Sequence, residues 1–341
     1  MTGFRGPRGW RTAILALMLI AVCACGGGAG IRSASSVTRA SVPSPTPSVT
    51  STPSPTPTAT CTSSPTATAT GTPTPLPPLR AEIDLERPEV AQGCTAVVWV
   101  KTSLPCHVWG TIDNRVLHFV SVSELRHYCL VGMQALAWLG PHPLEVTARS
   151  EDGREIELDT SLHVISGEYG RESIQFSPKV AKLLDPKFTR PEMLRLGEVY
   201  ATFTPFAYWE ESFTWPFGGA ITSRFGTRRD YGGEMESCHT GVDIDGVTGD
   251  PVCAPAPGMV LLADVLTVRG GAVIVDHGAG VLSGFYHLDS IDVEVGESVQ
   301  QGDPLGKMGS TGLSTGSHLH WELRVGGVAV DPVEWTGRTF P

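Results

Sequence analysis

The fold of the C-terminal part of this chain is decided by the stretch Gly309-Ser310-Thr311-Gly312-Leu313-Ser314-Thr315-Gly316-Ser317-His318-Leu319-His320-Trp321-Glu322. Its glycines let the backbone turn tightly and approach a neighbouring molecule closely. The residues Leu319–Val325, which overlap the end of this stretch, are typical of a β-strand. Side chains two residues apart in a strand point to the same face, so His318 and His320 are expected to share one.

Three more segments of the last third carry histidines: His239-Thr240-Gly241-Val242-Asp243, Asp276-His277-Gly278 and Tyr286-His287-Leu288. If the first is extended, His239 and Asp243 lie on one face by the same alternation. Two such β segments can close around one ion when they are neighbours in a sheet. Imidazole nitrogens and carboxylate oxygens are ordinary zinc ligands, and catalytic zinc sites keep three protein ligands and a water. The remaining histidines could move protons or stabilise an oxyanion.

Strand-forming runs separated by glycines occupy the rest of this region, at Ala220–Arg224, Met259–Val268, Ala272–Asp276 and Val281–Leu288. Together with the motifs above, these strand-forming runs resemble peptidase family M23. Its members are the LytM and lysostaphin-type zinc endopeptidases that cut peptide cross-links of bacterial peptidoglycan. Ile221-Thr222-Ser223-Arg224-Phe225-Gly226 is similar to the opening strand of the family, and Phe285-Tyr286-His287-Leu288 is a compressed form of its Tyr-x-His-Leu motif. The resemblance runs from about Trp215 to Trp335 and implies an antiparallel sheet that floors a groove for an extended peptide.

The resemblance also implies a role for each site residue. His239, Asp243 and His320 are implied as ligands of Zn²⁺. His287 and His318 are implied as the catalytic pair, which positions or deprotonates the attacking water and stabilises the tetrahedral intermediate. Because all five residues are present, the sequence favours an active endopeptidase on peptidoglycan. The alternatives are a non-catalytic protein that binds peptidoglycan or activates another wall hydrolase, and an enzyme that acts on secreted proteins.

Two cysteines depart from the family pattern. Cys238 directly precedes His239, so a thiolate ligand is conceivable. Adjacent strand residues face opposite sides, which favours instead a disulfide between Cys238 and Cys253. Eight cysteines in an exported chain would agree with disulfides, since that compartment is oxidising. Asp245 shares strand parity with Asp243 and is a rival carboxylate, although the spacing favours Asp243.

Three other residues near these motifs have open roles. His277 is predicted to be a turn residue rather than a ligand. Glu322 shares a face with His320 and either orients it from behind or faces solvent. Tyr231 is a weaker candidate for contacting the oxyanion.

The N-terminus resembles an export signal. Arg5, Arg8 and Arg11 precede the apolar run Ala13–Val22, which is too short to span a bilayer as a helix. The segment Val22-Cys23-Ala24-Cys25-Gly26 is similar to a bacterial lipobox. We therefore expect residues 1–25 to be a lipoprotein signal peptide, with lipid on Cys25 and a membrane-anchored, extracytoplasmic protein at the cell surface or envelope. A cleaved secretory peptide without lipid is the alternative.

Between the signal and the last domain, composition changes twice. Residues 26–79 are rich in Ser, Thr and Pro and form a predicted disordered linker. Residues 80–166 carry short strands such as Ala96–Val100 and Leu144–Ala148, with a hairpin turn at Glu151–Arg154, and predict an immunoglobulin-like β-sandwich. Its scattered histidines lack metal-ligand spacing.

Residues 167–213 are a predicted connector, partly helical, with Pro191 at a first helical position. Its place before residues 214–341, the M23-like domain, suggests a hypothesis of auto-inhibition. The fold class expected for the whole chain is mainly β. Its 341 residues carry a net charge of -10, which gives no basic surface for nucleic acid.

Overall fold

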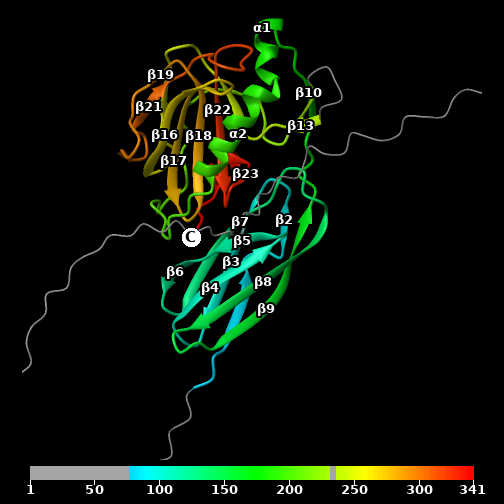
Figure 1. Ribbon diagram of the computed structural model, residues 1–341, viewed down its shortest axis with the longest axis vertical. Helices are drawn as coiled ribbons and strands as arrows, with labels where there is room; N and C mark the ends of the chain where they lie inside the picture. The colour runs from blue at the N-terminus through cyan, green and yellow to red at the C-terminus, as the bar shows by residue number, and fades with distance from the viewer. Residues whose placement is uncertain (1–76, 231–235) are drawn as a thin grey trace, which may run out of the picture. The chain divides into compact units, whose positions relative to one another are not determined.

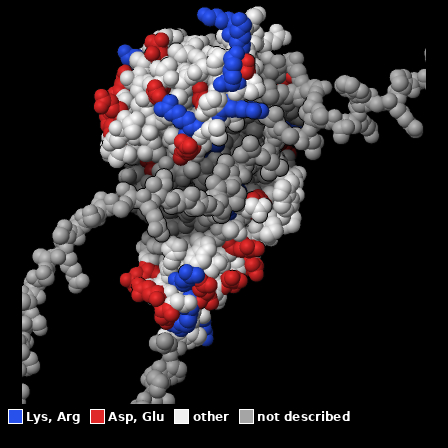
Figure 2. Space-filling model, in the orientation of Figure 1, with Lys and Arg blue, Asp and Glu red and all other residues white. Residues whose placement is uncertain are grey.

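The computed structural model describes residues 77–230 and 236–341. Three predictions lie outside the described residues. They concern the signal peptide with Cys25, nearly all of the linker, and Tyr231. No helix in the described part of the chain is long and apolar enough to cross a membrane. Figure 2 shows basic and acidic side chains interspersed on one face of the described surface.

The first folded region is a sandwich of two β-sheets. One sheet has the order β1 (Ala81–Leu85), β3 (Thr95–Thr102), β7 (Arg126–Gly132) and β6 (Val120–Ser123). The other has the order β2 (Glu89–Ala91), β9 (Glu155–Ile165), β8 (Gly140–Ser150), β4 (Cys106–Ile112) and β5 (Arg115–His118). Alternate residues of β8 are buried, as a strand with one face on a core requires. The predicted sandwich is confirmed, with the expected hairpin turn between β8 and β9.

The connector contains β10 (Arg171–Ser173), α1 (Pro178–Ala181), η1 (Lys182–Leu184) and α2 (Pro186–Tyr200). Asp185 caps α2 by accepting a hydrogen bond from the backbone N–H of Lys187. The predicted start at Pro191 is wrong, because this cap begins the helix at Pro186 and leaves Pro191 inside it.

The C-terminal region is built on an eight-stranded sheet. Its order is β11 (Ile221–Ser223), β14 (Val242–Asp245), β22 (His318–Val325), β18 (Val281–Leu288), β17 (Gly270–Gly278), β16 (Gly258–Leu266) and β20 (Ser298–Val299), with β23 (Val328–Val330) also paired to β22. All of these pairings are antiparallel. The strands predicted from sequence coincide with β11, β16, β17, β18 and β22.

Two smaller sheets and a short helix flank this main sheet. The first small sheet consists of β10, β12 (Arg228–Asp230) and β13 (Glu236–Cys238). The second consists of β15 (Pro251–Cys253), β21 (Pro304–Lys307) and β19 (Ser290–Ile291). The helix is α3 (Pro332–Gly337). In the first of them, β10 pairs with β12 in parallel. The connector is therefore part of the C-terminal fold.

The two faces of the main sheet are buried differently. One face contributes Phe285, Trp321 and Leu323 to a large apolar core. The other face is covered over β16, β17 and β18 by α2, as Figure 1 shows. The Tyr200 hydroxyl of α2 is hydrogen-bonded to the hydroxyl of Tyr286, which is fully buried. The helix thus covers this face over β16 to β18, and the ring of Tyr200 also contacts Arg324 of β22.

Candidate metal centre and active site

The centre of the site is set by the register of β14 and β22. Asp243 pairs with His320 across the two strands, and their side chains lie on one face of the sheet. Asp243 Oδ1 lies 2.8 Å from His320 Nδ1. The next position of β22 on that face is His318, whose Nε2 lies 3.7 Å from the same carboxylate oxygen. The predicted shared face of His318 and His320 is therefore confirmed.

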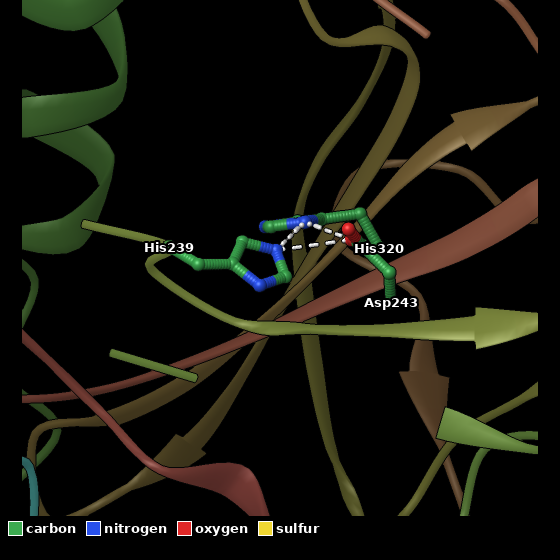
Figure 3. A group of neighbouring side chains, drawn as sticks. All are labelled: His239, Asp243 and His320. Carbon is green, nitrogen blue, oxygen red and sulfur yellow. Dashed lines mark hydrogen bonds and ion pairs between the residues drawn. The ribbon is translucent and has the colours of Figure 1, made fainter. Parts of the chain in front are cut away.

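His239 reaches the same point by a different route. His239 lies in a loop that precedes β14. Its proximity to Asp243 is therefore not a result of strand alternation, which the sequence analysis had expected. Backbone hydrogen bonds to Thr227 and Gly226 fix this loop. Figure 3 shows the three side chains converging, with His239 Nε2 3.0 Å from both His320 Nδ1 and Asp243 Oδ1.

A glycine lets the loop lie this close to β22. A Cβ at Gly241 would lie 2.3 Å from the backbone oxygen of Trp321 and 2.9 Å from His320 Nε2. No side chain fits between the loop and the strand, so the His-x-Gly-x-Asp spacing has a steric cause.

The donor chemistry of the three atoms suits a cation. His239 Nδ1 lies 3.0 Å from the carbonyl oxygen of Arg224, which can only accept, so this nitrogen carries the hydrogen and Nε2 presents a lone pair. Burial lowers the pKa of His239 to about 4, which keeps the ring neutral. Burial also lowers the pKa of His320, but its hydrogen bond to Asp243 and the nearby negative charges of Asp243 and Glu322 outweigh this effect and raise that pKa. Among the described residues, this is the group of ligand-type side chains close enough to share one metal ion.

The predicted catalytic pair lies beside this group. His287 has a positive φ of 64°, and its backbone N–H donates to the carbonyl oxygen of Arg269. The rings of His287 and His318 are 4.9 Å apart between centroids. Burial, followed by the neighbouring histidines His318 and His320, lowers the pKa of His287 to about 3. The structure therefore brings all five predicted site residues together.

Backbone oxygens fix the protonation sites of this pair. His287 Nδ1 lies 2.8 Å from the oxygen of Thr311, and His318 Nδ1 lies 2.9 Å from the oxygen of Gly316. Because carbonyl oxygens accept, each Nδ1 carries the hydrogen and each neutral ring has its lone pair on Nε2. Both carbonyls belong to the glycine-rich stretch 309–322, which thus orients the pair.

Glu322 supports His320 from behind. Its side chain is fully buried, and its Oε2 lies 3.8 Å from His320 Nε2. Burial raises the pKa of Glu322, but Arg324 and His320 outweigh this effect and hold the pKa well below its usual range. Arg324 Nη2 lies 2.5 Å from Glu322 Oε1. Of the two roles left open by the sequence, the structure supports orientation of His320 rather than exposure to solvent.

Two other predicted candidates lie outside the group. Asp245 is exposed and does not join it. His277 is not a ligand, as predicted, but it is buried at the end of β17 rather than in a turn, and its nitrogens face Pro257 O and Ser283 Oγ.

The predicted disulfide between Cys238 and Cys253 is not present in the structure. Both are free cysteines, as are the other three in the described residues, Cys94, Cys106 and Cys129. Cys238 ends β13 and Cys253 ends β15, and these strands belong to different sheets. The thiol of Cys238 instead packs against the apolar core.

Sequence reasoning missed three polar residues around the metal group. Arg229 Nη2 donates to Asp243 Oδ2 at 2.7 Å, and Arg229 Nε donates to Glu172 Oε1 at 2.5 Å. Ser223 Oγ lies 3.2 Å from His239 Nδ1. No spacing signal links these residues to the ligands, because they come from strands that only the fold brings together.

Comparison with known proteins agrees with this geometry. Residues 237–332 match the model of Peptidase family M23. The chain contains an M23 peptidase domain. Over this part it is 38% identical, across 113 residues, to the DD-carboxypeptidase/endopeptidase Mpg of Neisseria meningitidis, covering 33% of this chain and 26% of that protein. The M23 domain thus resembles a curated enzyme.

Other relatives of the M23 domain have a different described role. The murein hydrolase activator NlpD of Escherichia coli is 33% identical over 135 residues, 39% of this chain and 32% of that protein. The activator EnvC of the same organism is 37% identical over 124 residues, 36% of this chain and 29% of that protein. The chain thus spans about a quarter to a third of the length of these curated relatives.

A solved structure is similar beyond the M23 domain. The putative peptidase M23 from Pseudomonas aeruginosa has a TM-score of 0.55 and 27% identity, and the similarity covers 75% of this chain and 97% of that one. The chain is therefore mainly β with an M23 peptidase fold, as the sequence predicted.

Proposed function

We propose that this protein is a zinc-dependent endopeptidase that hydrolyses peptide cross-links of bacterial peptidoglycan. The observation that carries the proposal is the convergence of all five residues at one place beside β14, β18 and β22. Three ligand-type atoms converge within about 3 Å of one another, and two further histidines present free Nε2 atoms beside them.

In this proposal His239 Nε2, Asp243 Oδ1 and His320 Nδ1 hold the zinc ion. With both rings neutral and without a hydrogen at these two atoms, two nitrogen lone pairs and a carboxylate oxygen would face one point, a donor set that fits a divalent cation. When bound, zinc polarises a carbonyl group and makes a water available as a nucleophile near neutral pH.

The proton chemistry belongs to His287 and His318. In its neutral form each ring can take a proton at Nε2 or, once protonated, donate it to an oxyanion or a leaving amine. The low pKa of His287, about 3, keeps this ring neutral at physiological pH. In this proposal His287, which stays neutral, orients the attacking water through its Nε2 lone pair, and His318, beside Asp243 Oδ1, steadies the charge that develops.

We further propose an envelope location. The signal-like N-terminus would place the chain outside the cytoplasm, with lipid on Cys25 and the Ser/Thr/Pro-rich segment as a tether. The sandwich of residues 80–166 would then act as a spacer or a wall-binding module for the M23 domain of residues 214–341. The relatives named as murein hydrolase activators support this location.

The second candidate is an activator of another wall hydrolase, as two relatives are named. The full set of metal-binding and catalytic side chains favours catalysis, because an activator would not need it. The two are separated by incubating the full chain with purified peptidoglycan and analysing the products by mass spectrometry. An endopeptidase converts cross-linked muropeptides into monomers when no other enzyme is present. An activator leaves them unchanged and instead raises the rate of an added murein hydrolase, a result that would refute the proposal.

A further inference from the structure

Glu172, Ser223 and Arg229 surround the outer side of the metal group, and each comes from a different strand. Arg229 on β12 donates to Asp243 Oδ2, the oxygen that does not face the histidines, at 2.7 Å. Ser223 on β11 lies 3.2 Å from His239 Nδ1 through its Oγ. Glu172 on β10 accepts hydrogen bonds from both Arg229 and Ser223, the latter at 2.9 Å.

The hydrogen bonds of this network run in one direction. His239 Nδ1 carries its hydrogen and can only donate, and Arg229 Nη2 donates to Ser223 Oγ at 3.0 Å. The Ser223 hydroxyl then has its own hydrogen for Glu172 Oε1. A carboxylate only accepts, so the Ser223 hydroxyl and the Arg229 Nε–H both end on Glu172.

Charge explains why this acceptor matters. The guanidinium of Arg229 is a fixed cation whose side chain is only 14% exposed, and it is bound directly to a carboxylate that would also bind zinc. Alone, this cation would compete with the metal for Asp243. Glu172 supplies the second negative charge, so Arg229 bridges two carboxylates and Asp243 keeps its charge for the metal side.

We propose that Glu172 is a positioning residue for the metal centre, acting through Arg229 and Ser223 on the ligands Asp243 and His239. The inference rests on the proposed zinc site. It extends that site into the connector, because β10 places Glu172 there by pairing in parallel with β12, and both strands lie outside the residues that match the family model. Residues behind the ligands commonly change metal affinity by about 10- to 100-fold when they are replaced.

The test measures Zn²⁺ affinity of the metal-free full chain by competition with a chromophoric chelator at pH 7. Glu172→Gln keeps the shape of the side chain and removes its charge. Glu198→Gln, an exposed position on α2, is the matched control for the loss of one negative charge. We expect Glu172→Gln to weaken Zn²⁺ binding by about 10- to 100-fold and the control to change it less than about twofold. The unfolding midpoint of each metal-free variant verifies that it is folded.

A double-mutant cycle tests the route through Arg229. If Glu172 acts by neutralising this cation, then Glu172→Gln has a much smaller effect on Zn²⁺ affinity in an Arg229→Gln background. An equal effect in both backgrounds, or no effect of Glu172→Gln in a folded chain, would overturn the inference and leave the zinc site intact. A wild-type chain that binds no Zn²⁺ would overturn the proposed function as well.

Discussion

His277 should make the stability of this protein depend on pH. The ring is completely buried, its Nδ1 lies 2.8 Å from the carbonyl oxygen of Pro257, and its Nε2 lies 2.9 Å from Ser283 Oγ. Ser283 Oγ also accepts from the indole N–H of Trp321, so its own hydrogen is directed to His277 Nε2. A proton added at Nε2 would therefore point at the hydroxyl hydrogen of Ser283, and the charged imidazolium would be buried away from water.

The size of the effect follows from the pKa. Burial lowers the pKa of His277 from 6.5 to about 4. The unfolded chain therefore binds a proton in this range that the folded chain rejects, and stability falls as pH falls from 6.5 toward 4. Proton linkage gives a loss of about 2 kcal/mol between pH 7 and pH 5, and about 3 kcal/mol by pH 4. The first figure corresponds to a shift of the unfolding midpoint of about 4–8 °C.

His277→Asn removes the titrating ring, so the difference in stability between wild type and variant isolates this contribution. Urea unfolding of both proteins at pH 7, 6 and 5 is the assay, with the exposed His163→Asn as the control. We expect the variant to be less stable than wild type at pH 7, and the difference in their unfolding free energies to narrow by about 2 kcal/mol at pH 5. A gap that stays constant across this range would refute the reasoning.

Two further substitutions test the packing that positions the site. Gly241→Ala should destabilise the fold by about 1–3 kcal/mol and weaken Zn²⁺ binding, because the new methyl group would lie 2.3 Å from Trp321 O and 2.9 Å from His320 Nε2. Unfolding midpoints and chelator competition measure the two effects. Tyr200→Phe should cost about 1–3 kcal/mol in urea unfolding, because it leaves the buried hydroxyl of Tyr286 without its partner on α2.

Each of these two predictions has a result that contradicts it. Gly197→Ala is the control for an added methyl group, since nothing lies within 4 Å of a Cβ built there. If Gly241→Ala were as stable as this control, the loop would not need the glycine. An unchanged urea midpoint for Tyr200→Phe would mean that the hydroxyl pair does not hold α2 on the sheet.

The parts of the site that lie on regular strands could be predicted from the sequence. The alternation of β22 places His318 and His320 on one face, and β14 places Asp243 opposite His320. Strand alternation does not place His239, because this residue lies in the loop before β14. The position of His287 depends on a backbone with positive φ, which a strand pattern does not indicate.

The surroundings of the ligands could not be predicted, because they depend on pairings between distant segments. Glu172 and Arg229 are 57 residues apart and meet only when β10 pairs with β12. Pro191 was a plausible helix start by composition, but the cap at Asp185 begins α2 earlier. Cys238 and Cys253 looked like a pair because they flank the same strand in sequence, while the fold places them in different sheets.

The central claim is tested most directly by measuring bound zinc and peptidoglycan hydrolysis together, in wild type, His320→Ala and His318→Ala. The account predicts about one zinc per chain and release of soluble fragments for wild type. His320→Ala should lose the metal, and His318→Ala should keep it but lose at least about a hundredfold in activity. A wild-type chain that carries a full complement of zinc and leaves every peptidoglycan preparation intact would contradict the account.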